Sequence, residues 1–167
     1  MDRTNLDGLV EYPVKALYKI GGCPEVIQLL TDNPDVEMDS DAADDVFDKY
    51  LFDYGYVDST TEEAAAYICA EADCMGATSM TMQGMRLYIT VYCHKNYMDI
   101  NVSKFRGMAG NRRDNLVRLV DNELNGSDIF GIGALKLESA RVVPAPTGFT
   151  ARELTYSVPD FARLGMQ

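Results

Sequence analysis

The segment from Asn111 to Phe161 constrains the fold most, because its pattern predicts a helix, a tight turn and two strands in succession. The helix is expected over Arg112–Leu124, where one apolar stripe recurs at helical spacing. That stripe consists of Leu116, Leu119, Val120 and Leu124. Asn111 is the expected N-cap, and Asn125-Gly126 is the expected left-handed stop. The segment therefore predicts a rigid structural unit, and it contains no reactive cluster.

Strand patterns follow and precede this helix. Strands are expected at Leu135–Val143 and Ala151–Val158, and two earlier ones at Ala66–Cys74 and Met85–His94. Alternation is clearest in Met85–His94, where apolar and polar side chains take opposite faces. The apolar face holds Leu87, Ile89, Val91 and Cys93, and the other face holds Tyr88, Thr90, Tyr92 and His94. The intervening run MGATSMTMQG is predicted to be a long hairpin loop.

Helical patterns dominate the first part of the chain. A helix over Val10–Ile20 is expected to break at Gly21-Gly22, and Pro24 suits the first turn of a second helix. Together these patterns predict an α+β fold with an antiparallel β-sheet and helices packed on one face, in the order helices–β–β–α–β–β. The chain is expected to form a single domain, residues 1–167. It comprises N-terminal helices (1–30), an acidic and aromatic segment acting as an arm (31–63), and a sheet-and-helix core (64–163).

The charge of the chain limits its partners. The formal net charge is −11, and between Thr31 and Glu63 the only basic residue is Lys49. Such a surface repels DNA and anionic membranes, and no compensating basic patch is evident beyond Arg112 and Arg113. The apolar runs are far shorter than the roughly 20 residues that span a bilayer, and no secretory signal is recognisable, so an intracellular protein is expected.

Several patterns that suggest chemistry fail on spacing. The acidic run fails as a calcium loop, because an EF-hand beginning at Asp39 would place Ala43, Asp44 and Tyr50 at positions 5, 6 and 12. The glycines of GSDIFGIGAL follow a helix and lack a Lys-Ser or Lys-Thr pair, which argues against a phosphate loop. We therefore expect a solvated acidic face and a turn at these two places.

The cysteines and the single histidine give no clear site either. Cys69 and Cys74 point to opposite strand faces, which disfavours a zinc site, and the other cysteines are not paired at ligand spacing. Cys93 and His94 also point to opposite faces of one strand, so they cannot form a dyad. No catalytic, metal or cofactor-binding residue is predicted.

Four aromatic residues alternate in the acidic segment. They are Tyr50, Phe52, Tyr54 and Tyr56, and their spacing predicts an extended chain with aromatic rings on one side. Base stacking would require a basic groove, whereas these rings lie among aspartates. Two interpretations remain open: a subunit interface, or side chains buried in the domain's own core.

The strings YLFDYGYVD, MRLYITVYCHKN, RRDNLVRLVDNELNGSDIFGIGALKL and GFTARELTYSVPDFAR resemble a family of tailed-bacteriophage morphogenesis proteins. The element order is similar to that of tail terminator, or tail completion, proteins at the head–tail junction. The similarity covers Tyr50 to Arg163, and its most specific part is Leu124 to Gly133.

This resemblance implies a structural virion protein without catalytic residues or cofactors. It implies a homo-oligomeric ring, typically hexameric, that caps the tail tube and meets the head-side connector protein. The ring would reside in the virion neck after assembly in the host cytoplasm, and DNA would pass through it without specific binding. Two alternatives remain: a head–tail adaptor, stopper or other tail component, and a small enzyme with a site around His94, Tyr88 and Tyr92.

Overall fold

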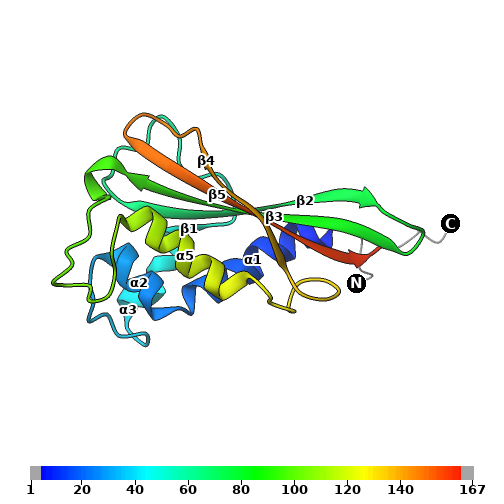
Figure 1. Ribbon diagram of the computed structural model, residues 1–167, viewed down its shortest axis with the longest axis horizontal. Helices are drawn as coiled ribbons and strands as arrows, with labels where there is room; N and C mark the ends of the chain where they lie inside the picture. Colours follow the sequence, from blue (N-terminus) through cyan, green and yellow to red (C-terminus); the bar gives the residue numbers. More distant parts are fainter. Residues whose placement is uncertain (1–4, 163–167) are drawn as a thin grey trace.

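Five strands form one sheet in the order β1-β2-β3-β5-β4, and helices cover one of its faces in the computed structural model, which describes residues 5–162 (Figure 1). The strands are β1 (Leu51–Phe52), β2 (Ala66–Ala77), β3 (Met82–His94), β4 (Lys136–Val143) and β5 (Phe149–Phe161). The helices are α1 (Asp7–Gly21), α2 (Pro24–Thr31), α3 (Asp41–Asp44), α4 (Val46–Lys49), the 3-10 turn η1 (Lys95–Tyr97) and α5 (Arg112–Leu124). The predicted α+β class is confirmed. The last residue of the resemblance and of the expected core, Arg163, lies outside the described residues.

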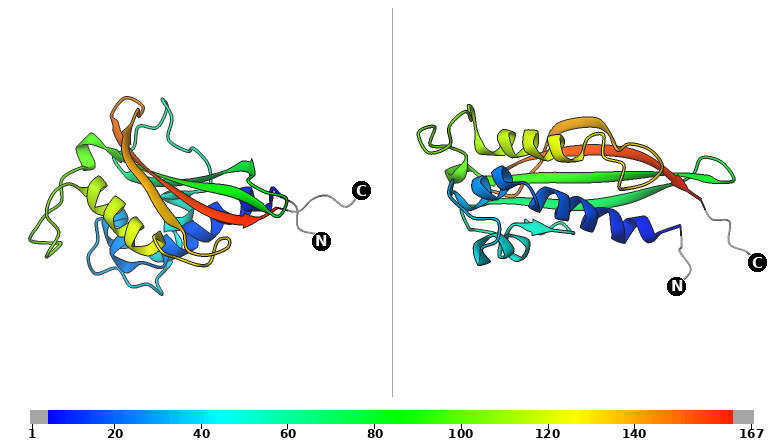
Figure 2. Two further views of the ribbon diagram at one scale, coloured as in Figure 1. Left: turned by 45° about the vertical axis from the view of Figure 1, so that its right-hand side comes forward. Right: turned by 90° about the horizontal axis from the view of Figure 1, so that it is seen from below.

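The helices lie on the same side of the sheet because the apolar alternation of the strands faces them. In β3 every second residue from Met85 to Cys93 is buried, and these residues form one core with α1, α2 and α5. Figure 2 shows α1 and α5 side by side beneath the long strands. The predicted faces of Met85–His94 are therefore confirmed.

One edge of the sheet differs from the prediction of a purely antiparallel sheet. β1 pairs with β2 in parallel, through Leu51 opposite Ile68 and Phe52 opposite Cys69, so the sheet is mixed. The chain reaches this edge from α4 and then takes residues 53–65 to return to the start of β2. A two-residue strand is too short to leave an alternation pattern, which explains why it was not predicted.

The β2–β3 hairpin is longer than predicted. β2 continues to Ala77 and β3 begins at Met82, so the expected long loop is wrong and only a short turn separates the strands. The amide of Thr78 closes this turn by donating to the carbonyl of Met82 at 2.8 Å. A register shift between Cys74 and Ala77, with Gly76 at a φ of 83°, interrupts the alternation that would have revealed the strand. The hairpin extends past the helical layer (Figure 1).

Helix α5 spans the predicted residues. The amide of Asp114 donates to Oδ1 of Asn111 at 2.8 Å, which is the expected cap. All four residues of the predicted stripe are buried against the sheet and the other helices. Gly126 has a φ of 81° and ends the helix, and the chain then enters β4 at the far edge of the sheet.

The N-terminal helices also follow the prediction closely. α1 begins at Asp7, three residues earlier than expected, and the chain bends at Gly21-Gly22 before Pro24 opens α2. Because a Cβ on Gly21 would lie only 2.4 Å from the ring of Phe47, glycine there lets α4 pack closely on the end of α1. This close approach shapes the surface described next.

Candidate functional site: an apolar hollow beside the sheet edge

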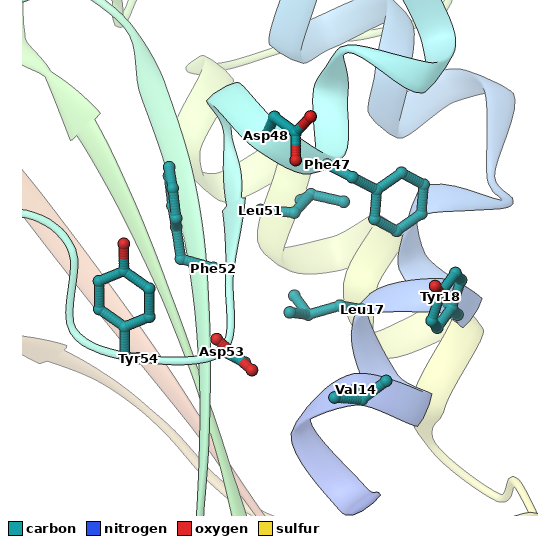
Figure 3. A pocket seen from close by; sticks show the side chains of 9 residues that line it. All are labelled: Val14, Leu17, Tyr18, Phe47, Asp48, Leu51, Phe52, Asp53 and Tyr54. Carbon is teal, nitrogen blue, oxygen red and sulfur yellow. The ribbon is translucent and has the colours of Figure 1, made fainter. Parts of the chain in front are cut away.

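A hollow of about 410 Å³ opens between α1, α4 and β1 (Figure 3). The residues that line it are Val14, Leu17 and Tyr18 of α1, Phe47 and Asp48 of α4, and Leu51, Phe52, Asp53 and Tyr54 of β1 and the following bend. Its walls are mostly apolar, and two carboxylates lie among them. Such a composition suits a partner with an apolar surface and nearby cations.

Aromatic packing forms one wall of this hollow. The rings of Tyr18 and Phe47 lie 5.2 Å apart, and the side chain of Tyr18 is 67% exposed. Because Tyr18 adjoins the other apolar residues of the hollow, it forms part of a contiguous exposed apolar surface, which is typical of an interaction site. Tyr18 is not among the residues predicted for an interface, although its position off the buried stripe of α1 is a sequence signal that indicates exposure.

The four aromatic residues predicted for an interface fall into two groups. Phe52 and Tyr56 stack with centroids 3.8 Å apart, and Tyr54 lies edge-on to both rings. Tyr50 lies outside this group but shares its contact with Tyr67, whose ring is 6.2 Å from Tyr50 and 5.3 Å from Tyr56. The expected continuous extended chain is wrong after Phe52, because a bend at Asp53 and Tyr54 folds Tyr56 back over Phe52.

This fold-back places the aromatic segment on the sheet face opposite the helices. There Tyr67 and Phe149 form a second, smaller core with Val57 and Ala65, and Tyr50 and Phe52 pack against it. Burial raises the pKa of Tyr67 well above its usual range, and the nearby carboxylate of Glu63 adds to the effect. Tyr54, by contrast, remains 52% exposed at the rim of the hollow. Tyr50 and Phe52 thus pack against the protein's own core, and a subunit-interface role for Tyr50, Phe52, Tyr54 and Tyr56 stays a prediction.

The surroundings of His94 bear on the enzyme alternative. Nδ1 of His94 accepts a hydrogen bond from the amide of Asn96 at 3.1 Å, and its ring lies edge-on to Phe149 at 5.1 Å. Gly148 also lies close to this ring, since a Cβ there would be 3.1 Å from Nε2. His94 shares its face with Tyr88 and Tyr92 as predicted, but it does not line any of the three hollows described in this section.

The three buried thiols, those of Cys23, Cys69 and Cys93, lie in environments that disfavour reactivity. Cys93 is fully buried on the helix side of β3, and burial raises its pKa to about 11. Burial likewise raises the pKa of Cys23 and of Cys69 to about 11. Within residues 5–162, no three His, Cys, Asp or Glu side chains lie close enough together to hold a metal ion.

Two further hollows flank the other edge of the sheet. A groove of about 290 Å³ runs between α5 and β4, lined by Asp114, Val117, Arg118, Asp121, Leu137, Ala140, Arg152 and Leu154. A hollow of about 280 Å³ lies near the tip of the β2–β3 hairpin, between Met75 and Pro159. Neither hollow is evident from the sequence, because each joins elements far apart in the chain.

Fold and surface together define a small α+β protein with an exposed apolar hollow at one edge of its sheet. In the described part of the chain, no helix has the length and apolar character needed to cross a membrane. The sequence profile of the YomW family matches residues 24–158, so the chain belongs to the YomW family and is a phage-related protein. No curated protein matches the chain.

Proposed function

We propose that this protein is a structural virion protein that forms a ring at the head–tail junction, caps the tail tube and joins it to the head-side connector. Membership of a phage-related family supports the phage setting. The observation that carries the ring is that one sheet presents two different open edges, β4 on one side and the outer edge of β2 on the other. A ring of identical subunits needs two different, complementary faces on each subunit.

The connection from Leu124 to Gly133, which carries the most specific part of the resemblance, supports a role in shape. The amide of Gly126 donates to the carbonyl of Leu135 at 2.8 Å, and that of Ile132 donates to Pro159 at 2.7 Å. The first bond joins the two ends of the connection, and the second fixes it to β5. A segment held in this way can present a defined surface to a neighbouring protein.

The acidic segment is suited to a channel that passes DNA. We expect part of the surface between Thr31 and Glu63 to line or rim the central channel of the ring. Its carboxylates repel the phosphates of DNA, so DNA can slide through the channel without binding to it. In this proposal the chain assembles in the host cytoplasm and ends in the virion neck. The tail tube protein and the head-side connector protein are its neighbours.

No catalytic role is part of this proposal. The ring of His94 lies edge-on to Phe149 and close to Gly148, and burial raises the pKa of the Cys23, Cys69 and Cys93 thiols. The enzyme alternative requires His94 to act on a substrate. A phage carrying His94→Gln should therefore remain infective if the proposal is right.

Removal of the gene from the phage that encodes it tests the proposal. Negative-stain images of the lysate should show filled heads without tails together with overlong tubes, because an uncapped tube continues to grow. Tails of normal length beside heads that lose DNA would instead favour the head–tail adaptor or stopper. Normal, infective particles would overturn both neck assignments.

A further inference from the structure

Both open edges of the sheet lie next to exposed apolar side chains. β1 pairs with β2 only at Ile68 and Cys69, so the outer edge of β2 from Ala70 to Ala77 has no strand partner within residues 5–162. β4 pairs with β5 and forms the opposite edge. Unpaired edges of this kind readily accept a further strand.

The apolar surface beside β2 comes from α1. This helix packs beneath β2, and Val10, at 72% exposure, lies on its surface together with Val14 and the strongly exposed Tyr18. Val14 and Tyr18 also line the hollow of about 410 Å³. The open edge of β2 and the outer side of α1 thus border one continuous area that includes the hollow.

The apolar surface beside β4 faces the same side of the sheet. Leu137 and Ala140 lie opposite Tyr156 and Leu154, which belong to the helix-side core, so they face the helices as well. Val142 follows on that face and is 64% exposed. No helix covers these residues beyond α5, and the groove of about 290 Å³ results.

The charges of the two areas are complementary. Asp48 and Asp53 line the hollow, and Glu71 and Asp73 are exposed along the open part of β2. On the other side, Arg118 lines the groove, and Lys136 and Arg141 are exposed on β4; none of these three cations forms an ion pair within residues 5–162.

The carboxylates on the β4 side are already engaged. Asp114 pairs with Arg113 and Arg152, each at 3.0 Å, and Glu138 pairs with Arg86 at 3.3 Å. Asp121 accepts a hydrogen bond from Tyr156 at 3.0 Å. Glu153 of β5 lies opposite Arg141 and is the one further carboxylate of the β4–β5 pairing, so it offsets one of the three cations. The excess charge available to a partner is therefore still positive beside β4, and it is negative beside β2.

We propose that β4 of one copy adds to the open edge of β2 of a second copy, and that α1 of the second copy fills the groove between α5 and β4 of the first. Because α1 lies beneath β2, sheet continuation carries it beneath the neighbour's β4, beside α5. Both layers then continue across the contact. On the helix side, Asp48 and Asp53 approach Arg118. On the opposite face of the sheet, which Arg141 occupies because it lies between Ala140 and Val142, Glu71 and Asp73 approach Lys136 and Arg141. This inference rests on the proposed function, since it supplies the two faces that a ring needs.

Charge reversal tests this pairing. One variant carries Asp53→Lys and Glu71→Lys, and a second carries Arg118→Glu and Arg141→Glu, so that one pair of charges is reversed on each face of the sheet. The association of each variant is followed by analytical ultracentrifugation up to sub-millimolar concentration. The wild type should self-associate, and each variant alone should associate at least about 10-fold more weakly, a loss of roughly 1.4 kcal/mol. An equimolar mixture of the two should regain assembly, because each variant then meets a complementary neighbour.

The control keeps the charge change but moves it away from the hollow. Asp35→Lys with Asp39→Lys reverses two other exposed carboxylates, both in the acidic segment between Thr31 and Glu63. This variant should leave association unchanged. Reversed variants that stay folded and assemble like the wild type would overturn the inference, as would a wild type that stays monomeric throughout or a mixture that does not recover. The neck phenotype of the gene deletion is measured separately, so either idea can fail without the other.

Discussion

The guanidinium of Arg112 donates a hydrogen bond of 2.8 Å to the carboxylate of Asp32, across 80 residues of sequence. Arg112 is only 2% exposed, stacks on Tyr97 at 4.0 Å, and also donates to the backbone carbonyls of Leu29, Tyr97 and Asp99. Asp32 ends α2 with a φ of 53°, which carboxylate residues tolerate better than most. This one side chain therefore ties the end of α2 and the loop before α5 to the start of α5.

Replacement of Arg112 by Met should lower the free energy of unfolding by about 3 kcal/mol, because several buried carbonyls lose their donor. Urea denaturation with an unchanged m-value would measure the loss. Lys104→Met is the matched control. Lys104 contacts the same carboxylate but is 34% exposed, so its loss should stay below about 1 kcal/mol. Equal effects of the two changes would contradict a central role for Arg112.

Acid should destabilise the protein through Asp114. Burial alone would raise the pKa of this carboxyl, but hydrogen bonds from Arg113, Asn111 and Arg152 outweigh burial and lower its pKa to about 2. A carboxyl whose pKa is lower in the folded state than in the unfolded chain stabilises the folded state at pH values above its unfolded-state pKa, which is about 3.9. This contribution is lost as the pH falls toward 2. Since the side chain is 40% exposed, about 1 kcal/mol is expected.

Urea midpoints between about pH 5 and pH 2 would check this effect. Asp114→Asn removes the titrating group, so the midpoint of the variant should fall less steeply with acid than that of the wild type. Asp32 should contribute in the same direction: burial opposes ionisation, but hydrogen bonds from Lys104 and Arg112 lower its pKa. Parallel profiles for the wild type and Asp114→Asn would show that Asp114 is not involved.

Two glycines of the connection after α5 should respond differently to alanine. A Cβ on Gly131 would lie 2.3 Å from the carbonyl oxygen of Pro159 and 2.8 Å from the hydroxyl of Tyr12. Gly131→Ala should therefore cost about 3 kcal/mol by overpacking. Gly133→Ala meets open space and only strains a φ of 86°, which should cost about 1 kcal/mol. Thermal denaturation of the pair would reveal this order, and its reversal would refute the tight packing against β5.

Tyr54 and Tyr67 should separate assembly from folding. Tyr54→Ser removes a half-exposed ring at the rim of the hollow, so self-association should weaken while unfolding changes by less than about 1 kcal/mol. Tyr67→Ser empties the core on the opposite face, where Tyr67 is 1% exposed, and should cost about 3 kcal/mol or more. Sedimentation and urea titration of both variants would measure these effects. Loss of the fold in Tyr54→Ser would instead return this residue to the core.

The sequence predicted those elements whose signals are local. Helix α5 was predicted to the residue because its cap, stripe and stop lie within one stretch from Asn111 to Gly126. The alternation of β3 likewise showed which face meets the helices. Gly76 and a bulge, however, interrupt the alternation of side chains near the end of β2, so the sequence predicts a loop where the strand continues.

Features that depend on distant residues were not predictable in this way. β1 is defined only by its pairing with β2. β5 pairs with both β3 and β4, and α5 separates β3 from these two strands in the sequence, so local patterns do not reveal the strand order. The hollow combines α1 with residues that follow it by some thirty positions. Its aromatic rim was partly foreseen through Phe52 and Tyr54, whereas Tyr18 and Phe47 were not, because no sequence pattern connects the two elements.

Immunogold labelling of purified virions tests the central claim most directly. An antibody raised against the isolated protein should place gold at the head–tail junction of intact particles, and averaged images should show a ring of density at that position. Virions that carry no label, while the protein is abundant in the lysate, would contradict a structural role at the neck.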